Sequence, residues 1–383
     1  MKTVNLFSLF TLSLLILLAC SRENNTARVV GKIENLQSDT IFFTLTSYQD
    51  DPTYIFDTIV SQNGNFIIDT LINELHFGTI IAPEMFSTLD NGMEVLIRSK
   101  AINFFIEPKG ELKIDAVLLP ELTEYVLTGL ELNSQQNIYR EDIKVLLSEE
   151  SRLMFEYENL FYNNAPSSVF DDFEKRLREA HVGLVKIESE FIKRHPDFEL
   201  SAFLLLQSQK DTIQKHYEYF DEAVKNSSYG QIVAQKIDAW NRISIGTLPP
   251  DFKYQTLIGS SFRLSDHRNK YVVLDFWGSW CAPCIGGFPA MKQFYSENKS
   301  RVEFVGIACR DQKENWIRAV EEHDLDWIQI LNQTGENDLS KLFAIEGYPT
   351  KIIINPEGKI EGIYLGESEE FYMDLAKLLN LST

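Results

Sequence analysis

A strand followed directly by a helix is encoded in residues 271–284, which read YVVLDFWGSWCAPC. The apolar run Tyr271–Trp277 is short and rich in β-branched and aromatic residues, which is typical of a buried strand. Cys281 and Cys284 follow where this strand meets a helix expected over Pro283–Asn298. The sequence therefore places two thiols on the first turn of a helix.

The C-x-x-C spacing on a first helical turn has a chemical consequence. Two cysteines so placed can close a disulfide with little strain. Backbone N–H groups and the helix dipole favour the thiolate form of the first thiol, and the thiolate is the attacking species in disulfide exchange. We expect Cys281 to be the exposed nucleophile and Cys284, one turn deeper, to be the resolving thiol.

Strands alternate with helices through the rest of the C-terminal part, residues 246–383. Further strands are expected at Val302–Ala308, Trp327–Leu331, Lys351–Ile354 and Ile360–Tyr364, and further helices at Lys313–His323, near Asp338–Phe343 and from Glu369. This alternation predicts an α/β sheet that carries helices on both faces.

The upstream sequence predicts two more parts, so the chain of 383 residues is expected to be multidomain. Residues 28–118 contain short alternating runs separated by turn signals such as Asn63-Gly64, which predict an all-β, sandwich-like domain. Residues 119–245 change to helical spacing and are expected to form a helical middle segment.

The N-terminus predicts export. Lys2 precedes the apolar run Leu6–Leu18, which is short for a membrane span and fits the core of a signal peptide. The ending Leu-Leu-Ala-Cys resembles the lipobox of bacterial lipoproteins, which implies a signal peptide over 1–19, lipid on Cys20 and a polar tether over 20–27. An ordinary secretory signal with an incidental cysteine is the alternative. Export would place the chain where disulfides persist.

Charge and residue counts exclude several classes of function. A formal net charge of -20 argues against a nucleic-acid partner, because a phosphate backbone needs clustered Lys and Arg. The six histidines are scattered singly, so neither a metal site nor a cofactor is expected. The four cysteines are too few for a disulfide scaffold. Of these, Cys309 is interpreted as a buried inert thiol, with a third redox thiol as the alternative.

Four motifs carry a family resemblance. The segment Asp275–Cys284 resembles the active site of thioredoxins, and Gly347-Tyr348-Pro349-Thr350 resembles their cis-proline loop. Leu248–Phe252 and Asn355–Lys359 are similar to flanking motifs of the TlpA/ResA group of envelope disulfide reductases. The resemblance covers about residues 246–383 and implies a thioredoxin fold there. The β domain is similar to one found ahead of such domains in Bacteroidetes lipoproteins.

The resemblance also implies roles for four further residues. Asp275 matches the buried carboxylate that takes the proton of Cys284, although a carboxylate satisfied at a strand end is an alternative. Pro349 would follow a cis peptide bond, and the backbone of Tyr348 would offer hydrogen bonds to a substrate peptide. Trp280 would shield the disulfide.

One position departs from the family pattern. Many TlpA/ResA-like reductases have a Glu three residues beyond the second cysteine, and this chain has Gly287 there, preceded by Gly286. Any proton-handling role of that Glu is therefore absent or reassigned. The sequence leaves Asp275 as the one acid positioned to move the Cys284 proton.

Together these features predict a lipid-anchored thiol–disulfide oxidoreductase of the cell envelope. It would face the periplasm, with the outer membrane favoured by Ser21, and would reduce protein or peptide disulfides with electrons from a membrane-derived donor. Pro283 before the second cysteine resembles reducing members of the family. An oxidase or isomerase, and a non-enzymatic surface-binding lipoprotein, are alternatives. A peroxiredoxin is disfavoured because Leu274 and Trp277 stand where its Pro-x-x-x-Thr/Ser-x-x-Cys motif needs proline.

Overall fold

The computed structural model describes residues 25–48 and 53–381. The expected signal peptide over 1–19 and the cysteine at position 20 lie outside the described residues. The described part of the chain divides into two compact units, residues 25–47 with 53–184 and residue 48 with 185–381. Within the described part of the chain, no helix is long and apolar enough to cross a membrane.

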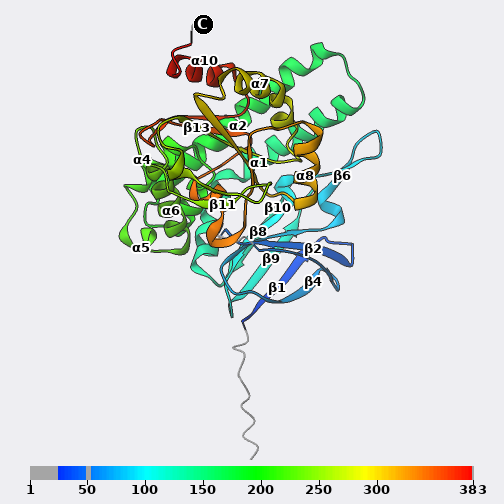
Figure 1. The fold of residues 1–383 in the computed structure, drawn as a ribbon. Coiled ribbons are helices and arrows are strands. Elements are labelled where there is room, and N and C mark those ends of the chain that lie inside the picture. The colour runs from blue at the N-terminus through cyan, green and yellow to red at the C-terminus, as the bar shows by residue number, and fades with distance from the viewer. Residues whose placement is uncertain (1–24, 49–52, 382–383) are drawn as a thin grey trace, which may run out of the picture. The chain divides into compact units, whose positions relative to one another are not determined.

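The first unit contains two four-stranded sheets (Figure 1). One has the order β10-β9-β1-β4, formed by β1 (Thr26–Glu34), β4 (Asn65–Leu71), β9 (Glu111–Leu118) and β10 (Thr123–Thr128). The other has the order β3-β2-β5-β8, formed by β2 (Thr40–Thr46), β3 (Tyr54–Val60), β5 (His76–Ile81) and β8 (Ile102–Ile106). A small hairpin joins β6 (Phe86–Thr88) to β7 (Glu94–Leu96).

Both sheets bury alternate residues in one shared core. The pattern is clearest in β1, whose side chains alternate between buried and exposed along its length. Phe43 and Phe104 from one sheet and Phe66 and Ile114 from the other belong to the same buried cluster. Two sheets that enclose one apolar layer form the sandwich that the alternation in the sequence predicted.

Strand pairing continues past the boundary expected at residue 118. Residues 123–128, predicted as part of the helical segment, instead form β10 and pair antiparallel with β9. The reason is a period-two pattern in which Tyr125 and Leu127 are buried and their neighbours are exposed. The helices begin with α1 (Glu131–Tyr162) and α2 (Phe170–Arg194), and the boundary between the two units falls within α2.

The second unit opens with short helices. These are α3 (Glu199–Leu205), α4 (Lys210–Tyr217), α5 (Glu222–Lys225) and α6 (Ser228–Arg242). Ser227 caps α6 by accepting a hydrogen bond from the Gly230 N–H at 3.2 Å. Lys236 on α6 forms an ion pair of 3.1 Å with Glu346, next to the predicted cis-proline loop. The helical middle segment is therefore confirmed, and part of it contacts the C-terminal domain.

A five-stranded mixed sheet of order β15-β14-β13-β16-β17 organises the C-terminal domain. Its strands are β13 (Tyr271–Trp277), β14 (Val302–Ala308), β15 (Ile328–Leu331), β16 (Thr350–Ile354) and β17 (Ile360–Leu365). Its helices are α7 (Ala282–Asn298), α8 (Lys313–Glu322), α9 (Leu339–Leu342) and α10 (Glu369–Leu378). A hairpin of β11 (Lys253–Gln255) and β12 (Ser261–Arg263) precedes the sheet.

The central strand β13 is buried on both faces. Val273 and Trp277 belong to one apolar cluster, whereas Leu274 and Phe276 belong to a second cluster on the opposite face. This explains the continuous apolar run in the sequence, because a strand covered on both sides needs no polar alternation. The predicted thioredoxin fold is confirmed, and the end of β13 carries the chain into the dithiol.

Candidate active site

The two thiols lie at the beginning of α7 and form a disulfide bond. Cys281 is the N-cap residue, and the backbone N–H of Cys284 points at its Sγ at 3.3 Å. In the described structure Cys281 is 4% exposed and Cys284 2%, so the expectation that Cys281 would be exposed is wrong for the oxidised form. Both sulfurs are packed into the cluster that contains Trp277 and Phe288. Because both thiols are buried, any difference in their reactivity comes from the helix N-terminus, which stabilises the thiolate of Cys281.

Asp275 lies in the middle of β13 and is 1% exposed. Its Oδ1 atom has no hydrogen-bond partner among the described residues, and the nearest cation is Lys351 Nζ at 3.5 Å. Burial raises the pKa of Asp275, the charge of Lys351 opposes this rise, and the carboxylate of Glu367 adds to it. A carboxylate whose pKa is raised is a stronger base than an ordinary carboxylate, so it is better suited to accept a proton from a thiol.

A second carboxylate, Glu367, lies beside the dithiol helix, and no motif in the sequence predicted it. A side chain at Gly287 would collide with its carboxyl group. Glu367 Oε2 lies 2.6 Å from Lys351 Nζ, and its Oε1 accepts a hydrogen bond of 2.9 Å from the Tyr372 hydroxyl. No local pattern relates Gly287 to Glu367, because the turn between β17 and α10 brings them together only in the folded chain.

The loop before β16 has the geometry that its motif predicted. The Tyr348–Pro349 peptide bond is cis. Gly366 N–H donates to the carbonyl of Pro349 at 2.8 Å, and the Thr350 hydroxyl donates to the carbonyl of Gly347 at 2.7 Å. Two hydrogen bonds therefore hold the loop on either side of the proline.

Trp280 and Tyr348 lie together. Their rings meet edge to face at 5.4 Å, and Trp280 Nε1 donates to the carbonyl of Cys309 at 3.1 Å. The indole of Trp280 remains half exposed, and Arg310 stacks on the Tyr348 ring at 5.9 Å. The structure thus groups the predicted aromatic residues into one partly open surface.

Cys309 is fully buried at the end of β14. Burial raises the pKa of its thiol to about 12. A thiol with so high a pKa forms almost no thiolate at neutral pH, which agrees with its interpretation as an inert residue. No group of His, Cys, Asp and Glu among the described residues is arranged to bind a metal ion.

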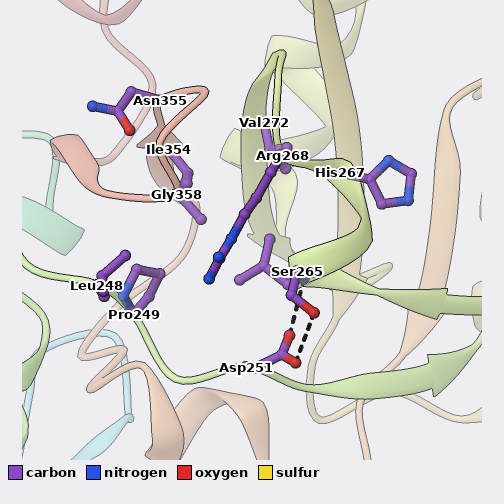
Figure 2. Close-up of a pocket in the computed structure, with 11 residues that line it drawn as sticks. Leu248, Pro249, Asp251, Ser265, His267, Arg268, Val272, Ile354, Asn355 and Gly358 are labelled. Carbon is purple, nitrogen blue, oxygen red and sulfur yellow. Dashed lines mark hydrogen bonds between the residues drawn. The ribbon is translucent and has the colours of Figure 1, made fainter.

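A separate cavity of about 30 Å³ is lined by residues of both flanking motifs (Figure 2). Leu248 and Pro249 from one motif and Asn355 and Gly358 from the other line it together with Arg268. Asp251 closes the edge by accepting hydrogen bonds from the backbone and hydroxyl of one serine, at 3.0 and 2.9 Å. The space suits one or two water molecules, and none of the predicted site residues lines it.

Known proteins resemble the C-terminal part of the chain. Residues 245–363 match the AhpC/TSA family. A thioredoxin-like protein, YneN of Bacillus subtilis, is 32% identical over 127 residues, which cover 32% of this chain and 73% of that protein. The thiol-disulfide oxidoreductase ResA of Bacillus subtilis is 31% identical over 140 residues, which cover 35% of this chain and 77% of ResA. The solved thioredoxin domain of a Bacteroides vulgatus thiol-disulfide oxidoreductase is 29% identical, covers 36% of this chain and 99% of that domain, and has a TM-score of 0.33.

Proposed function

The chain belongs to the thioredoxin-like thiol–disulfide oxidoreductases, and on that basis we propose that it reduces protein or peptide disulfides through Cys281 and Cys284. The observation that carries the proposal is the disulfide at the N-terminus of α7, next to the strand that carries buried Asp275. This arrangement provides a nucleophile, a resolving thiol and an acid–base group within one strand–helix unit.

Reduction proceeds in two exchange steps. The Cys281 thiolate attacks one sulfur of the substrate disulfide, a mixed disulfide forms, and the other substrate sulfur leaves as a thiolate that takes up a proton. Asp275 then accepts the proton of Cys284. The Cys284 thiolate attacks Cys281 Sγ, which closes the Cys281–Cys284 disulfide and releases the second substrate sulfur as a thiolate. Asp275 gives up its proton, and this thiolate takes one up. Counted from the dithiol, whose Cys281 proton is lost when its thiolate forms, the substrate gains two electrons and two protons and the enzyme loses them.

The substrate surface is assigned to the group around the cis-proline. The backbone N–H and C=O of Tyr348 have no hydrogen-bond partner in the described structure, and Tyr348 directly precedes the cis bond to Pro349. A peptide aligned beside it would make strand-like hydrogen bonds. The half-exposed indole of Trp280 adds an apolar contact next to the disulfide.

Location and direction complete the proposal. Lipid on Cys20 would anchor the mature protein to a membrane, more readily the outer one, with the catalytic domain facing the periplasm. A membrane-derived donor of two electrons would restore the dithiol after each turnover. The Ala-Pro pair between the cysteines, which lacks a basic residue, supports the reducing direction.

The reduction potential of the Cys281–Cys284 pair tests this proposal. We expect a value near the roughly -270 mV of thioredoxin, measured by equilibration with dithiothreitol buffers and alkylation of the free thiols. A value near the roughly -120 mV of DsbA would instead assign the oxidase role. The Cys281→Ser, Cys284→Ser double variant should lose all exchange with a disulfide peptide. Full biological activity in that variant would favour the non-enzymatic alternative.

A further inference from the structure

We propose that Glu367 and Lys351 are positioning residues that control proton exchange between Asp275 and Cys284, with Glu367 in place of the carboxylate that α7 lacks at Gly287. This inference rests on the proposed dithiol function. It adds two residues to the site from β16 and from the turn before α10, neither of which belongs to the C-x-x-C segment.

The Glu367 carboxyl group lies against the face of α7 that carries Cys284. Cys284 and Gly287 are three residues apart on α7, so they lie on the same face of the helix, and both are buried. A Cβ atom at Gly287 would overlap the carboxyl carbon and both carboxyl oxygens of Glu367. The Glu367 carboxyl group therefore fills the space beside this face. Gly287 is the residue that leaves room for it.

Lys351, Glu367 and Asp275 form a largely buried charge network. Lys351 is 1% exposed, and its ammonium lies 2.6 Å from Glu367 and 3.5 Å from Asp275. One buried cation is thus shared by two carboxylates, so the fully ionised group carries a net negative charge. Burying an unbalanced charge is costly, and one added proton removes the imbalance. Asp275, which is the more deeply buried carboxyl, is the residue that takes this proton.

The groups around Asp275 come from four further elements. Lys351 contributes the cation from β16, with the Phe371 ring 5.7 Å from its ammonium. Glu367 faces it from the turn after β17, and Tyr372 from α10 donates a hydrogen bond to Glu367. The dithiol itself lies on α7. Because the Glu367 side chain retains 26% exposure, it connects the buried charges to solvent.

These charges act on the resolving step. Cys284 transfers its proton to Asp275 as its sulfur attacks the mixed disulfide. Negative charge on Glu367 makes Asp275 a stronger base but holds it protonated to a higher pH. Positive charge on Lys351 has the opposite effect. Removing either charge should therefore shift the pH dependence of resolution, in opposite directions.

The chromogenic disulfide DTNB separates the two steps. Reduced protein releases one TNB anion when Cys281 attacks, and a second when Cys284 resolves the mixed disulfide. The rate of the second release, measured across acidic to alkaline pH, gives the midpoint for resolution. We expect Glu367→Gln to lower this midpoint by about one pH unit and Lys351→Met to raise it by about one pH unit.

Two controls keep the test specific. Glu369→Gln removes the same charge from the exposed first turn of α10 and should leave the midpoint unchanged. The double variant Gly287→Glu, Glu367→Gly returns a carboxylate to α7 and should restore the parent midpoint. If Lys351→Met does not fold, this double variant serves as the second test beside Glu367→Gln.

An unchanged midpoint in folded Glu367→Gln, in a parent that releases both TNB anions, would overturn the inference and leave the dithiol function intact. Absence of the second release from the parent at every pH would instead contradict the proposed function itself.

Discussion

Glu367 occupies the space that a side chain at Gly287 would need, although the two residues come from different elements of the C-terminal domain. The glycine on α7 and the glutamate before α10 are therefore one structural feature. Lys351 holds the Glu367 carboxyl group in this position through an ion pair of 2.6 Å. Position 287 needs glycine because any larger side chain would overlap the Glu367 carboxyl group.

A methyl group at Gly287 should destabilise the protein. Lys351 and Tyr372 hold the Glu367 carboxyl against this position, so Gly287→Ala forces it to move, and overpacking of this kind costs about 1–3 kcal/mol. The matched control is Gly286→Ala, because a Cβ atom there meets nothing within 4 Å. That variant should gain about 0.5–1 kcal/mol, since alanine is the better helix former. Urea unfolding of both oxidised variants measures the difference, and equal effects would contradict the packing argument.

Replacing Asp275 should stabilise the oxidised protein in a pH-dependent way. Burial raises the pKa of Asp275, so its contribution to stability is fully present below its unfolded pKa and is lost as pH rises through the folded pKa. Asp275→Asn removes this loss, while Lys351 keeps its pairing with Glu367. We expect a gain of about 1–4 kcal/mol near neutral pH, the range seen when buried charges are replaced, and no gain at acidic pH.

The measurement is the free energy of unfolding by urea as a function of pH. Exposed Asp266 provides the control, because Asp266→Asn removes a charge of the same sign on the surface. A gain for Asp275→Asn that is equal at all pH values would assign the effect to packing. The same variant should resolve mixed disulfides about 10²–10⁴-fold more slowly, the usual contribution of a general base.

The three thiols of the C-terminal domain should react in a fixed order after reduction. Iodoacetamide at neutral pH should label Cys281 first, because the N-terminus of α7 stabilises its thiolate. Cys309 should stay unlabelled in the folded protein, because its thiol is buried and its pKa is raised to about 12. Peptide mapping by mass spectrometry gives the order. Early labelling of Cys309 would assign it a redox role.

If Cys20 carries lipid, its replacement should change the membrane attachment of the protein. Cys20→Ala should release it into the soluble fraction or block removal of the signal peptide, because the acylated residue is then missing. Membrane fractionation and the apparent mass of the mature protein measure both outcomes. Ser21→Ala is a neighbouring control that should keep the protein membrane-associated. Unchanged attachment of the Cys20→Ala protein would exclude the lipid anchor.

Local patterns in the sequence were enough for most of the C-terminal fold. The apolar run Tyr271–Trp277 predicted β13 to the residue, and the alternation of strands with helices predicted a covered α/β sheet. The prediction for residues 123–128 was wrong. These residues form a short edge strand, and the preference of such a segment for strand over helix depends on its pairing with β9, which the sequence does not show.

The sequence by itself determined the dithiol, the cis-proline loop and the class of chemistry, because each of these depends on residues a few positions apart on one strand, helix or turn. Only the tertiary structure decided how the site handles charge. Lys351 and Glu367 reach Asp275 from β16 and from the turn after β17, and no sequence period relates these positions. Ion pairs between distant segments depend on how strands are ordered in the sheet, and that order is fixed by packing of the whole domain.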